Sequence, residues 1–420
     1  MVDQRSLLFH RDFRLLWGGV SISQFATQVT LFALPLLAVT ELHAGPLQVG
    51  LVTTCATAAF LVVGLPVGAW VDRVRRRGVL ILGDLGRGLL LGSLPLAAAL
   101  GALTLAQLYA VAIGVGILTV FFDVADQSYL PHVVGRERLV DGNAKMQASH
   151  SVADVSGPGL GGLIAQVISV PLMFLMVTAS FLSSSGCVGL IRGREPKPPR
   201  PERRDLRREV LEGLRFVLGH RLLRAIAACT GSHNFCSTMV QAMVIVLLAR
   251  GLALPAGTVG LFFTIAGLGG VAGAAVARRV ALWLGQGPAI WMSVGLSTPF
   301  GLLIPLAANG WRLWLAGAGF FMVAVGGAVY NVTQVSFRQR LCPERMLGRM
   351  NATMRFLVWG TMPLGGAVGG ALGSLIGVRP TLWVATAGAS LAFLPVLLSP
   401  LRRLRELPTD PAEATAAATL

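Results

Sequence analysis

Charged residues are scarce in this chain. Asp, Glu, Lys and Arg together make up only 13% of its 420 residues, whereas 54% of the residues are hydrophobic. A soluble domain normally contains roughly a quarter charged residues. The composition therefore excludes an ordinary soluble protein and indicates one that lies in a membrane.

Residues that build common catalytic and metal sites are also few or unsuitably spaced. The five cysteines contain no CxxC pair and the six histidines do not recur at metal-ligand spacing, so we expect neither a disulfide framework nor a metal site. A P-loop requires a glycine-rich turn that ends in lysine, but the two lysines, Lys145 and Lys197, follow Asn-Ala and Glu-Pro. We therefore predict no cofactor and no enzyme activity.

Long apolar segments are abundant. A helix needs about 20 apolar residues to cross a hydrocarbon layer of about 30 Å. We predict twelve membrane-spanning helices, at residues 14–40, 47–70, 78–101, 104–128, 143–167, 170–191, 222–249, 256–277, 287–308, 311–336, 351–376 and 380–399. The first segment is longer than the apolar core of a signal peptide, so we interpret it as a retained helix. The expected fold class is an all-α integral membrane protein.

Positive charge lies beside alternate ends of these segments. Thirty of the 35 Lys and Arg residues fall at the N-terminus, in the loops after segments 2, 4, 6, 8 and 10, or in the C-terminal tail. Arg250, Arg312 and Arg379 fall in the opposite loops, and Arg87 and Arg355 lie within segments. Because positive charge marks the cytoplasmic side, the pattern favours twelve spans with cytoplasmic N- and C-termini. It also accounts for the net charge of +16 without a nucleic-acid partner.

The longest polar stretch divides the segments into two groups of six. We predict an N-terminal six-helix bundle at residues 1–191, a cytoplasmic central loop at 192–221, a C-terminal six-helix bundle at 222–400 and a disordered cytoplasmic tail at 401–420. Within the loop, apolar residues recur at helical spacing from Leu206 to Val217 among arginines. This pattern predicts a basic amphipathic helix on the inner leaflet, with a solvated linker as the alternative.

The two halves of the chain resemble each other. Residues 137–146 and 345–354 share a Leu and an Asn-Ala-x-Met run at an offset of 208 residues, before segments 5 and 11. Glycine-rich runs follow both, at 157–162 and 365–370. Internal repeats of this kind are typical of transporters.

A spaced motif follows the second segment and reads Gly68-Ala-Trp-Val-Asp72-Arg73-Val-Arg-Arg76-Arg77. It resembles the Gly-x-x-x-Asp-Arg-x-x-Arg-Arg signature of the major facilitator superfamily, and the six-plus-six layout extends this resemblance over nearly the whole chain. A glycine lets a neighbouring helix approach closely, an aspartate can face a helix N-terminus, and arginines can pair with acidic groups or lipid phosphates. The resemblance implies the major facilitator fold and a cytoplasmic latch that holds the outward-open state. The alternative is a cluster of cytoplasmic positive charges alone.

A second motif lies in the fifth segment and reads Ala153-Asp-Val-Ser-Gly157-Pro158-Gly-Leu-Gly161-Gly162. It looks like the antiporter motif of the same family, with Ala153 in place of the first glycine. A proline between small residues kinks a membrane helix and permits close packing. We therefore interpret Gly157, Pro158, Gly161 and Gly162 as a pivot. In the family this motif accompanies proton-driven drug export more often than uptake. Ordinary small-residue packing is the alternative.

Several ionisable residues fall inside the apolar segments, where each is costly unless it is paired or wetted. Asp84 and Arg87 are one helical turn apart, at a depth similar to that of the two aspartates of segment 4. We expect a buried ion-pair cluster of Asp84, Arg87, Asp123, Asp126 and Arg355.

Asp154 differs from these residues in its depth. It lies eleven residues into the fifth segment, which corresponds to roughly 16 Å. Burial there favours the protonated carboxyl group, and His150 lies one turn earlier on the same face. We predict that Asp154 and His150 couple transport to protons. The alternative is that Asp154 only pairs with Arg355 of segment 11.

Polar side chains within segments 1, 7 and 10 are candidate substrate contacts. They lie among Phe25, Phe235 and Met239, and they are Gln24, Gln28, His233, Asn234, Gln241, Asn331 and Gln334. An apolar cavity with few polar groups suits bulky amphiphiles. Hydrogen bonding between helices is the alternative role for each of them.

The sequence therefore predicts a secondary transporter that exports a small, largely hydrophobic or amphiphilic compound, such as a drug, siderophore or secreted metabolite, by alternating access and in exchange for protons. Within the superfamily it resembles the transmembrane secretion effector branch, which includes enterobactin and macrolide exporters. We expect a functional monomer in the cytoplasmic (inner) membrane, whose partners are its substrate, protons and the lipid bilayer. A proton-coupled nutrient importer, which would need more buried charge, and a non-transporting membrane receptor on the same scaffold are the alternatives.

Overall fold

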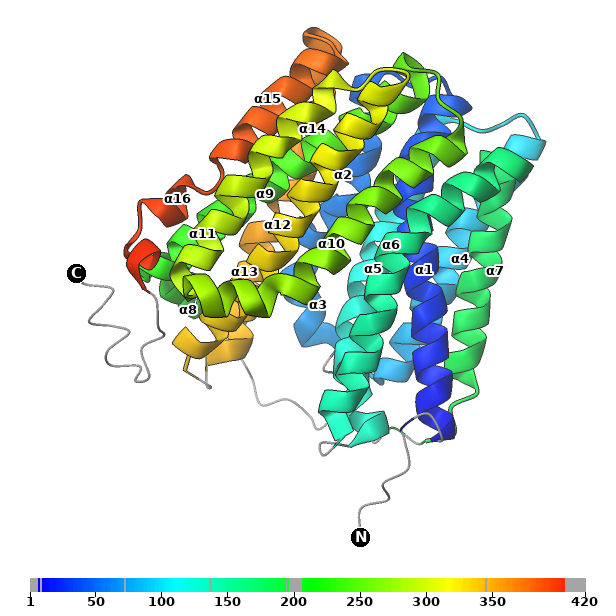
Figure 1. The fold of residues 1–420 in the computed structure, drawn as a ribbon. Helices are drawn as coiled ribbons and strands as arrows, with labels where there is room; N and C mark the ends of the chain where they lie inside the picture. The colour runs from blue at the N-terminus through cyan, green and yellow to red at the C-terminus, as the bar shows by residue number, and fades with distance from the viewer. Residues whose placement is uncertain are drawn as a thin grey trace. The chain divides into compact units, whose positions relative to one another are not determined.

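Helices make up the regular structure of the residues that the structure describes. The computed structural model describes residues 7, 10–71, 73–135, 138–193, 195, 206–343 and 346–404 (Figure 1). The first half contains α1 (Arg11–Thr40), α2 (Pro46–Val62), α3 (Gly64–Val71), α4 (Arg76–Ala99), α5 (Leu105–Val134), α6 (Leu139–Ile168) and α7 (Val170–Gly189). The second half contains α8 (Leu206–Gly219), α9 (Arg221–Val246), η3 (Leu247–Gly251), α10 (Ala256–Leu284), α11 (Gln286–Ser297), η4 (Thr298–Leu306), α12 (Trp311–Leu341), α13 (Leu347–Trp359), α14 (Thr361–Leu375), α15 (Val378–Leu391), α16 (Leu394–Leu397) and η6 (Pro400–Arg403).

Most of these helices are long and apolar. Within the described residues, ten helical segments are long and apolar enough to cross a membrane, which confirms a helical, multi-pass membrane protein. Helices also occupy the two remaining predicted segments, but α2 has only 17 residues, and α6, with 30 residues, contains Asp141, Lys145 and Asp154. The count of twelve spans therefore stays a prediction.

Proline determines where several predicted segments are divided. A proline has no N–H, so the carbonyl four residues earlier loses its helical hydrogen-bond partner. α2, α13 and α15 each end four residues before a proline, at Val62, Trp359 and Leu391, ahead of Pro66, Pro363 and Pro395. α6 behaves differently, because it continues as one helix through Pro158. The predicted pivot at this proline is therefore not a break in the helix.

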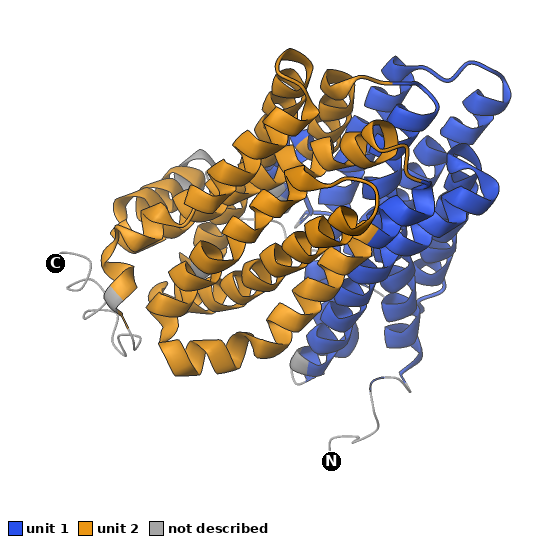
Figure 2. Ribbon diagram, turned by 45° about the horizontal axis from the view of Figure 1, so that its top comes forward, with its two compact units in different colours: residues 1–43, 58–204, 255–261 blue, residues 44–57, 205–254, 262–420 orange. Residues whose placement is uncertain are grey.

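The chain forms two compact units (Figure 2). Unit 1 comprises residues 1–43, 58–204 and 255–261, and unit 2 comprises residues 44–57, 205–254 and 262–420. The first turns of α2 thus belong to unit 2, and the first turns of α10 belong to unit 1.

Each unit has a separate hydrophobic core. In unit 1 the core includes Phe13, Phe122 and Tyr129. In unit 2 it includes Tyr330 and Phe337. Burial of these large side chains positions the polar residues described below.

Candidate functional site

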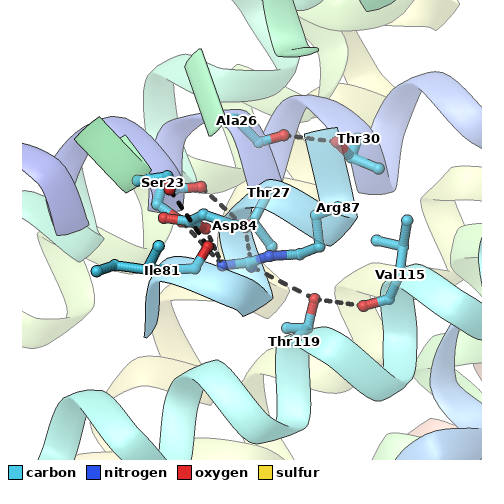
Figure 3. Close-up of polar contacts among 10 residues, drawn as sticks. Ser23, Ala26, Thr27, Thr30, Ile81, Asp84, Arg87, Val115 and Thr119 are labelled. Atoms are coloured by element: carbon cyan, nitrogen blue, oxygen red, sulfur yellow. Dashed lines mark hydrogen bonds and ion pairs between the residues drawn. The ribbon is translucent and has the colours of Figure 1, made fainter. Parts of the chain in front are cut away.

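A buried ion pair lies in unit 1. Asp84 and Arg87 on α4 form a salt bridge, and their side chains are 0% and 1% exposed (Figure 3). Ser23 on α1 donates a hydrogen bond to Asp84 Oδ1 at 2.9 Å and accepts one from Arg87 at 3.1 Å. A buried charge is tolerated only when it is paired and hydrogen-bonded, and this pair meets both conditions.

Aromatic rings and hydroxyl groups complete the surroundings of Arg87. Its guanidinium carbon lies 4.3 Å from the ring centroid of Phe122 and 4.6 Å from that of Phe181. Its Nη1 atom donates to the hydroxyl groups of Thr27, at 3.3 Å, and Thr119, at 3.5 Å. Arg87 thereby connects α1, α4, α5 and α7, which indicates a structural role for this part of the predicted cluster.

The other predicted members of the ion-pair cluster come from α5 and α13. Asp126 on α5 is buried, as Asp84 is. Arg355 belongs to α13 of unit 2, where its guanidinium carbon lies 4.7 Å from the ring centroid of Trp359. Its grouping with the acidic residues of unit 1 stays a prediction.

Asp154 is held by a residue that the sequence suggests as a substrate contact. The amide of Gln28 on α1 donates a hydrogen bond to Asp154 Oδ1 on α6, and the Asp154 side chain is exposed. The carboxyl group of Asp154 is therefore not isolated, because a neutral amide donates a hydrogen bond to it. His150 lies one turn earlier on α6, is half-buried, and its Nε2 atom has no hydrogen-bond partner within the described part of the chain.

The small residues of α6 bring α1 into contact with Asp154. A Cβ atom on Gly157 would lie 2.7 Å from Gln28 Cβ, and one on Gly161 would lie 3.2 Å from a methyl group of Val29. On the neighbouring face, a Cβ atom on Gly162 would lie 2.5 Å from the carbonyl oxygen of Ala256 and 2.9 Å from Gly260 Cα. The second sequence motif therefore forms two close helix contacts, one with α1 and one with the start of α10.

An apolar cavity of about 700 Å³ lies beside these residues, between α1, α6 and α7. Trp17, Phe25, Val152 and Ala153 are among its lining residues. The indole N–H of Trp17 donates a hydrogen bond to Ser149 Oγ at 2.9 Å. The N–H group, a polar group of the cavity wall, therefore already has a partner within the protein. A cavity of this kind accommodates the apolar part of a ligand.

Three of the six remaining substrate candidates are engaged in a contact between helices or with a neighbouring side chain. Asn234 on α9 donates to the carbonyl oxygen of Val358 at 3.2 Å, and Gln334 donates to Asn331 Oδ1 at 3.2 Å. Gln24 and His233 are half-buried and Gln241 is exposed. These contacts favour the alternative role for Asn234, and the substrate role of the others stays a prediction.

The predicted latch residues lie around the start of α4. Gly68 falls within α3, Arg73 is exposed in the turn that follows, and Asp72 lies outside the described residues. Arg77 donates to the carbonyl oxygens of Val188, at 3.2 Å, and Gly189, at 2.6 Å, at the end of α7. A cation there complements the negative end of the α7 helix dipole.

Glu195 completes this region, and sequence reasoning missed it. Its carboxylate accepts hydrogen bonds from the backbone N–H groups of Arg76, at 2.9 Å, and Arg77, at 3.1 Å, and it lies 3.9 Å from the Arg76 guanidinium. Its side chain is only 4% exposed. An acidic group stabilises a helix N-terminus, and Glu195 is the one acidic residue in the basic run from Arg192 to Arg200, which was the available signal.

Known proteins resemble the chain over most of its length. A family model described as Major Facilitator Superfamily matches residues 16–362. The enterobactin exporters EntS of Shigella boydii serotype 18 and Escherichia coli O81 are each 28% identical to it over 381 residues, which cover 86% of this chain and 86% of each relative.

Solved structures share the fold at lower identity. A bacterial homologue of the iron transporter ferroportin in an inward-facing state has a TM-score of 0.74 at 16% identity, covering 94% of this chain and 99% of that one. The nucleoside transporter NupG has a TM-score of 0.74 at 8% identity, covering 92% of this chain and 98% of that one. At these identities the likeness concerns the fold alone.

Proposed function

Because the chain belongs to the major facilitator superfamily and is therefore a membrane transporter and not an enzyme, we propose that it exports a small, largely hydrophobic or amphiphilic compound in exchange for protons. In this proposal twelve helices cross the cytoplasmic (inner) membrane with both termini in the cytoplasm. Two six-helix bundles of a monomer alternate access to a site near the midplane, and the central loop joins them.

The contact between Gln28 and Asp154 carries the proposal of proton coupling. A carboxylate within a membrane helix is costly in its charged form and is retained where it serves a function. The Asp154 side chain is not enclosed by the protein, and the neutral amide of Gln28 can hydrogen-bond either the ionised or the protonated carboxyl group. His150, one turn away, is the second group that could take up the proton.

The chemistry of the cargo follows from the cavity of unit 1. Its wall combines Trp17 and Phe25 with aliphatic residues of α6, which favours an aromatic or amphiphilic compound over a sugar or an ion. The similarity to enterobactin exporters makes a catecholate siderophore of the enterobactin type the first compound to test. Drugs and secreted metabolites of similar polarity are the next candidates.

The latch proposal now includes Glu195 beside Gly68, Asp72, Arg73, Arg76 and Arg77. Its carboxylate joins the segment after α7 to the start of α4, while Arg77 joins α4 to the end of α7. We infer that this network supports the start of α4 in the latch, which holds the outward-open state.

Replacement of Asp154 by Asn tests proton coupling. In everted membrane vesicles energised by a proton gradient, the wild-type protein is expected to accumulate enterobactin, and Asp154→Asn is expected to reduce this accumulation at least about tenfold, because Asn cannot exchange a proton. Exchange of labelled for unlabelled enterobactin without a gradient should continue. Asp141→Asn on the same helix is the matched control, because Asp141 is exposed and paired with Lys145.

Each alternative predicts a different result in the same vesicles. Proton-driven accumulation that survives in Asp154→Asn contradicts coupling through Asp154. Accumulation only in right-side-out vesicles identifies an importer, and the absence of flux for any compound of a hydrophobic panel identifies a non-transporting receptor.

A further inference from the structure

A second cavity lies in unit 2. It has a volume of about 570 Å³ and lies between the first two turns of α9 and the segment that joins α16 to η6. Arg221 and Arg224 line one side, and Pro395, Leu398 and Ser399 line the other. None of these residues belongs to the predicted latch, to the pivot or to the substrate candidates.

The cavity carries two unneutralised positive charges. Arg221 and Arg224 are exposed and one helical turn apart, so their guanidinium groups repel each other. Within the residues that the structure describes, neither side chain makes a hydrogen bond or an ion pair. Ser399 is already engaged, because its hydroxyl group donates to the carbonyl oxygen of Val396 at 2.8 Å and accepts from the N–H of Leu401 at 3.3 Å. An anion bound there would be recognised chiefly by the two arginines.

The cavity also lies at the ends of two candidate membrane spans. α9 starts one candidate span, Arg221–Gly251, and α15 with α16 forms another, Val378–Leu397. The lining residue Leu398 directly follows the second span and is 78% exposed. A soluble anion has no apolar part that could contact an exposed leucine. A phospholipid at the membrane surface presents a phosphate group and a hydrocarbon chain side by side.

We propose that this cavity binds the headgroup of an anionic phospholipid, with the phosphate between Arg221 and Arg224 and an acyl chain against Leu398. The bound lipid joins the start of α9 to the end of α16 and relieves the repulsion between the two arginines. Basic pockets between membrane helices on the cytoplasmic side are suited to such headgroups, and the arginine distribution places α9 Arg221 on that side. The proposal does not depend on which compound the protein transports.

The test measures lipid binding by the full-length protein in a neutral detergent. Dioleoylphosphatidylglycerol, dioleoylphosphatidylcholine and inorganic phosphate are added in parallel, and the unfolding temperature and the number of bound lipids by native mass spectrometry are recorded. For the wild-type protein only phosphatidylglycerol should raise the unfolding temperature, because a ligand that binds the folded state stabilises it.

Three variants locate the effect. Arg221→Gln/Arg224→Gln should bind phosphatidylglycerol about thirtyfold more weakly and lose one bound lipid, given the usual contribution of a cationic residue near an anionic surface. Arg278→Gln/Arg279→Gln removes two exposed arginines at the end of α10 of the same unit and should behave like the wild type. Leu398→Ser keeps both arginines and should weaken binding through loss of the acyl-chain contact.

Several outcomes would overturn the proposal. Equal phosphatidylglycerol binding by the wild type and the Arg221→Gln/Arg224→Gln variant would exclude this site. Stabilisation by inorganic phosphate but not by phosphatidylglycerol would indicate a soluble anion instead of a lipid. Phosphatidylglycerol binding that is unchanged in Leu398→Ser would exclude the proposed acyl-chain contact. If the double arginine variant unfolds without lipid, the Leu398→Ser result and the comparison of the two lipids still decide the question.

Discussion

At the scale of single residues, the pair of Asp84 and Arg87 illustrates what local spacing can predict. The i, i+3 relation within an apolar segment is enough to expect an ion pair, and these two members of the predicted cluster form a salt bridge. The groups that complete the site, Ser23, Phe122 and Phe181, come from three other helices. Which side chains of other helices reach Arg87 depends on how the helices pack. The spacing of residues along one helix does not predict this packing.

Removal of Arg87 alone should be strongly destabilising. In Arg87→Met the carboxylate of Asp84 stays buried without its partner, which typically costs about 3–5 kcal/mol. The unfolding temperature of the purified protein in detergent measures the loss. The double variant Asp84→Asn/Arg87→Met removes both charges and should recover at least half of the lost stability. A double variant no more stable than Arg87→Met would show that the charge of Asp84 is not the cause.

The polar substrate candidates show the limit of residue-level prediction. Gln28 was expected to face a substrate, but it binds Asp154, and Asn234 binds a backbone carbonyl group of α13. Whether a polar side chain in an apolar helix faces a cavity or a neighbouring helix depends on the rotation of that helix. Composition identifies such residues without fixing this rotation.

At the scale of helices, the glycine contacts follow the internal repeat. Cβ atoms on Gly157 and Gly162 would clash with α1 and with the start of α10, respectively. The residues 208 positions later behave in the same way: a Cβ atom on Gly365 would lie 2.3 Å from the carbonyl oxygen of Phe235, and one on Gly370 would lie 3.0 Å from Gly50 Cα on α2. Sequence alone revealed the repeated glycines, whereas the partners of each run required the structure.

Substitution of Gly162 by Ala should therefore disturb the packing of α6 on α10. The added methyl group would lie 2.5 Å from the carbonyl oxygen of Ala256, a backbone atom that cannot move freely. Overpacking of this kind costs about 1–3 kcal/mol. Gly186→Ala on α7 is the matched control, because a Cβ atom there meets no atom within 4 Å. The unfolding temperature should fall only in Gly162→Ala, and equal values for the two variants would contradict close packing as the role of this glycine.

At the scale of the whole molecule, charge distribution is the main evidence for orientation. The three arginines that fall on the minority side all have local contacts. Arg379 donates to the carbonyl oxygens of Pro305, at 3.1 Å, and Ala307, at 2.7 Å, and Arg250 donates to that of Ala44 at 3.5 Å. Arg312 lies 5.8 Å from the ring centroid of Trp311. These contacts explain their positions without weakening the positive-inside argument.

Apolar length predicted the helices of the fold well, because a span needs a minimum number of apolar residues. It could not predict which helix segments cluster together: residues 44–57 join unit 2 and residues 255–261 join unit 1. Hydrophobic runs report the length of a helix and not its neighbours. The same limitation applies to α6, because its polar residues lower its hydropathy and leave its membrane crossing a prediction. Two of these polar residues, His150 and Asp154, are also the ones proposed to couple transport to protons.

The number of spans can be decided by cysteine labelling at two positions. In a variant whose five native cysteines are replaced by Ala, Ala102→Cys lies between α4 and α5, and Arg278→Cys lies near the end of α10; both positions are exposed. With twelve spans and a cytoplasmic N-terminus, a membrane-impermeant maleimide should label Ala102→Cys in intact cells and Arg278→Cys only after permeabilisation. If α2 and α6 do not cross, the ten remaining spans place residue 102 in the cytoplasm and leave residue 278 there as well. Labelling of Ala102→Cys in intact cells therefore excludes the ten-span arrangement, and protection of both cysteines excludes twelve.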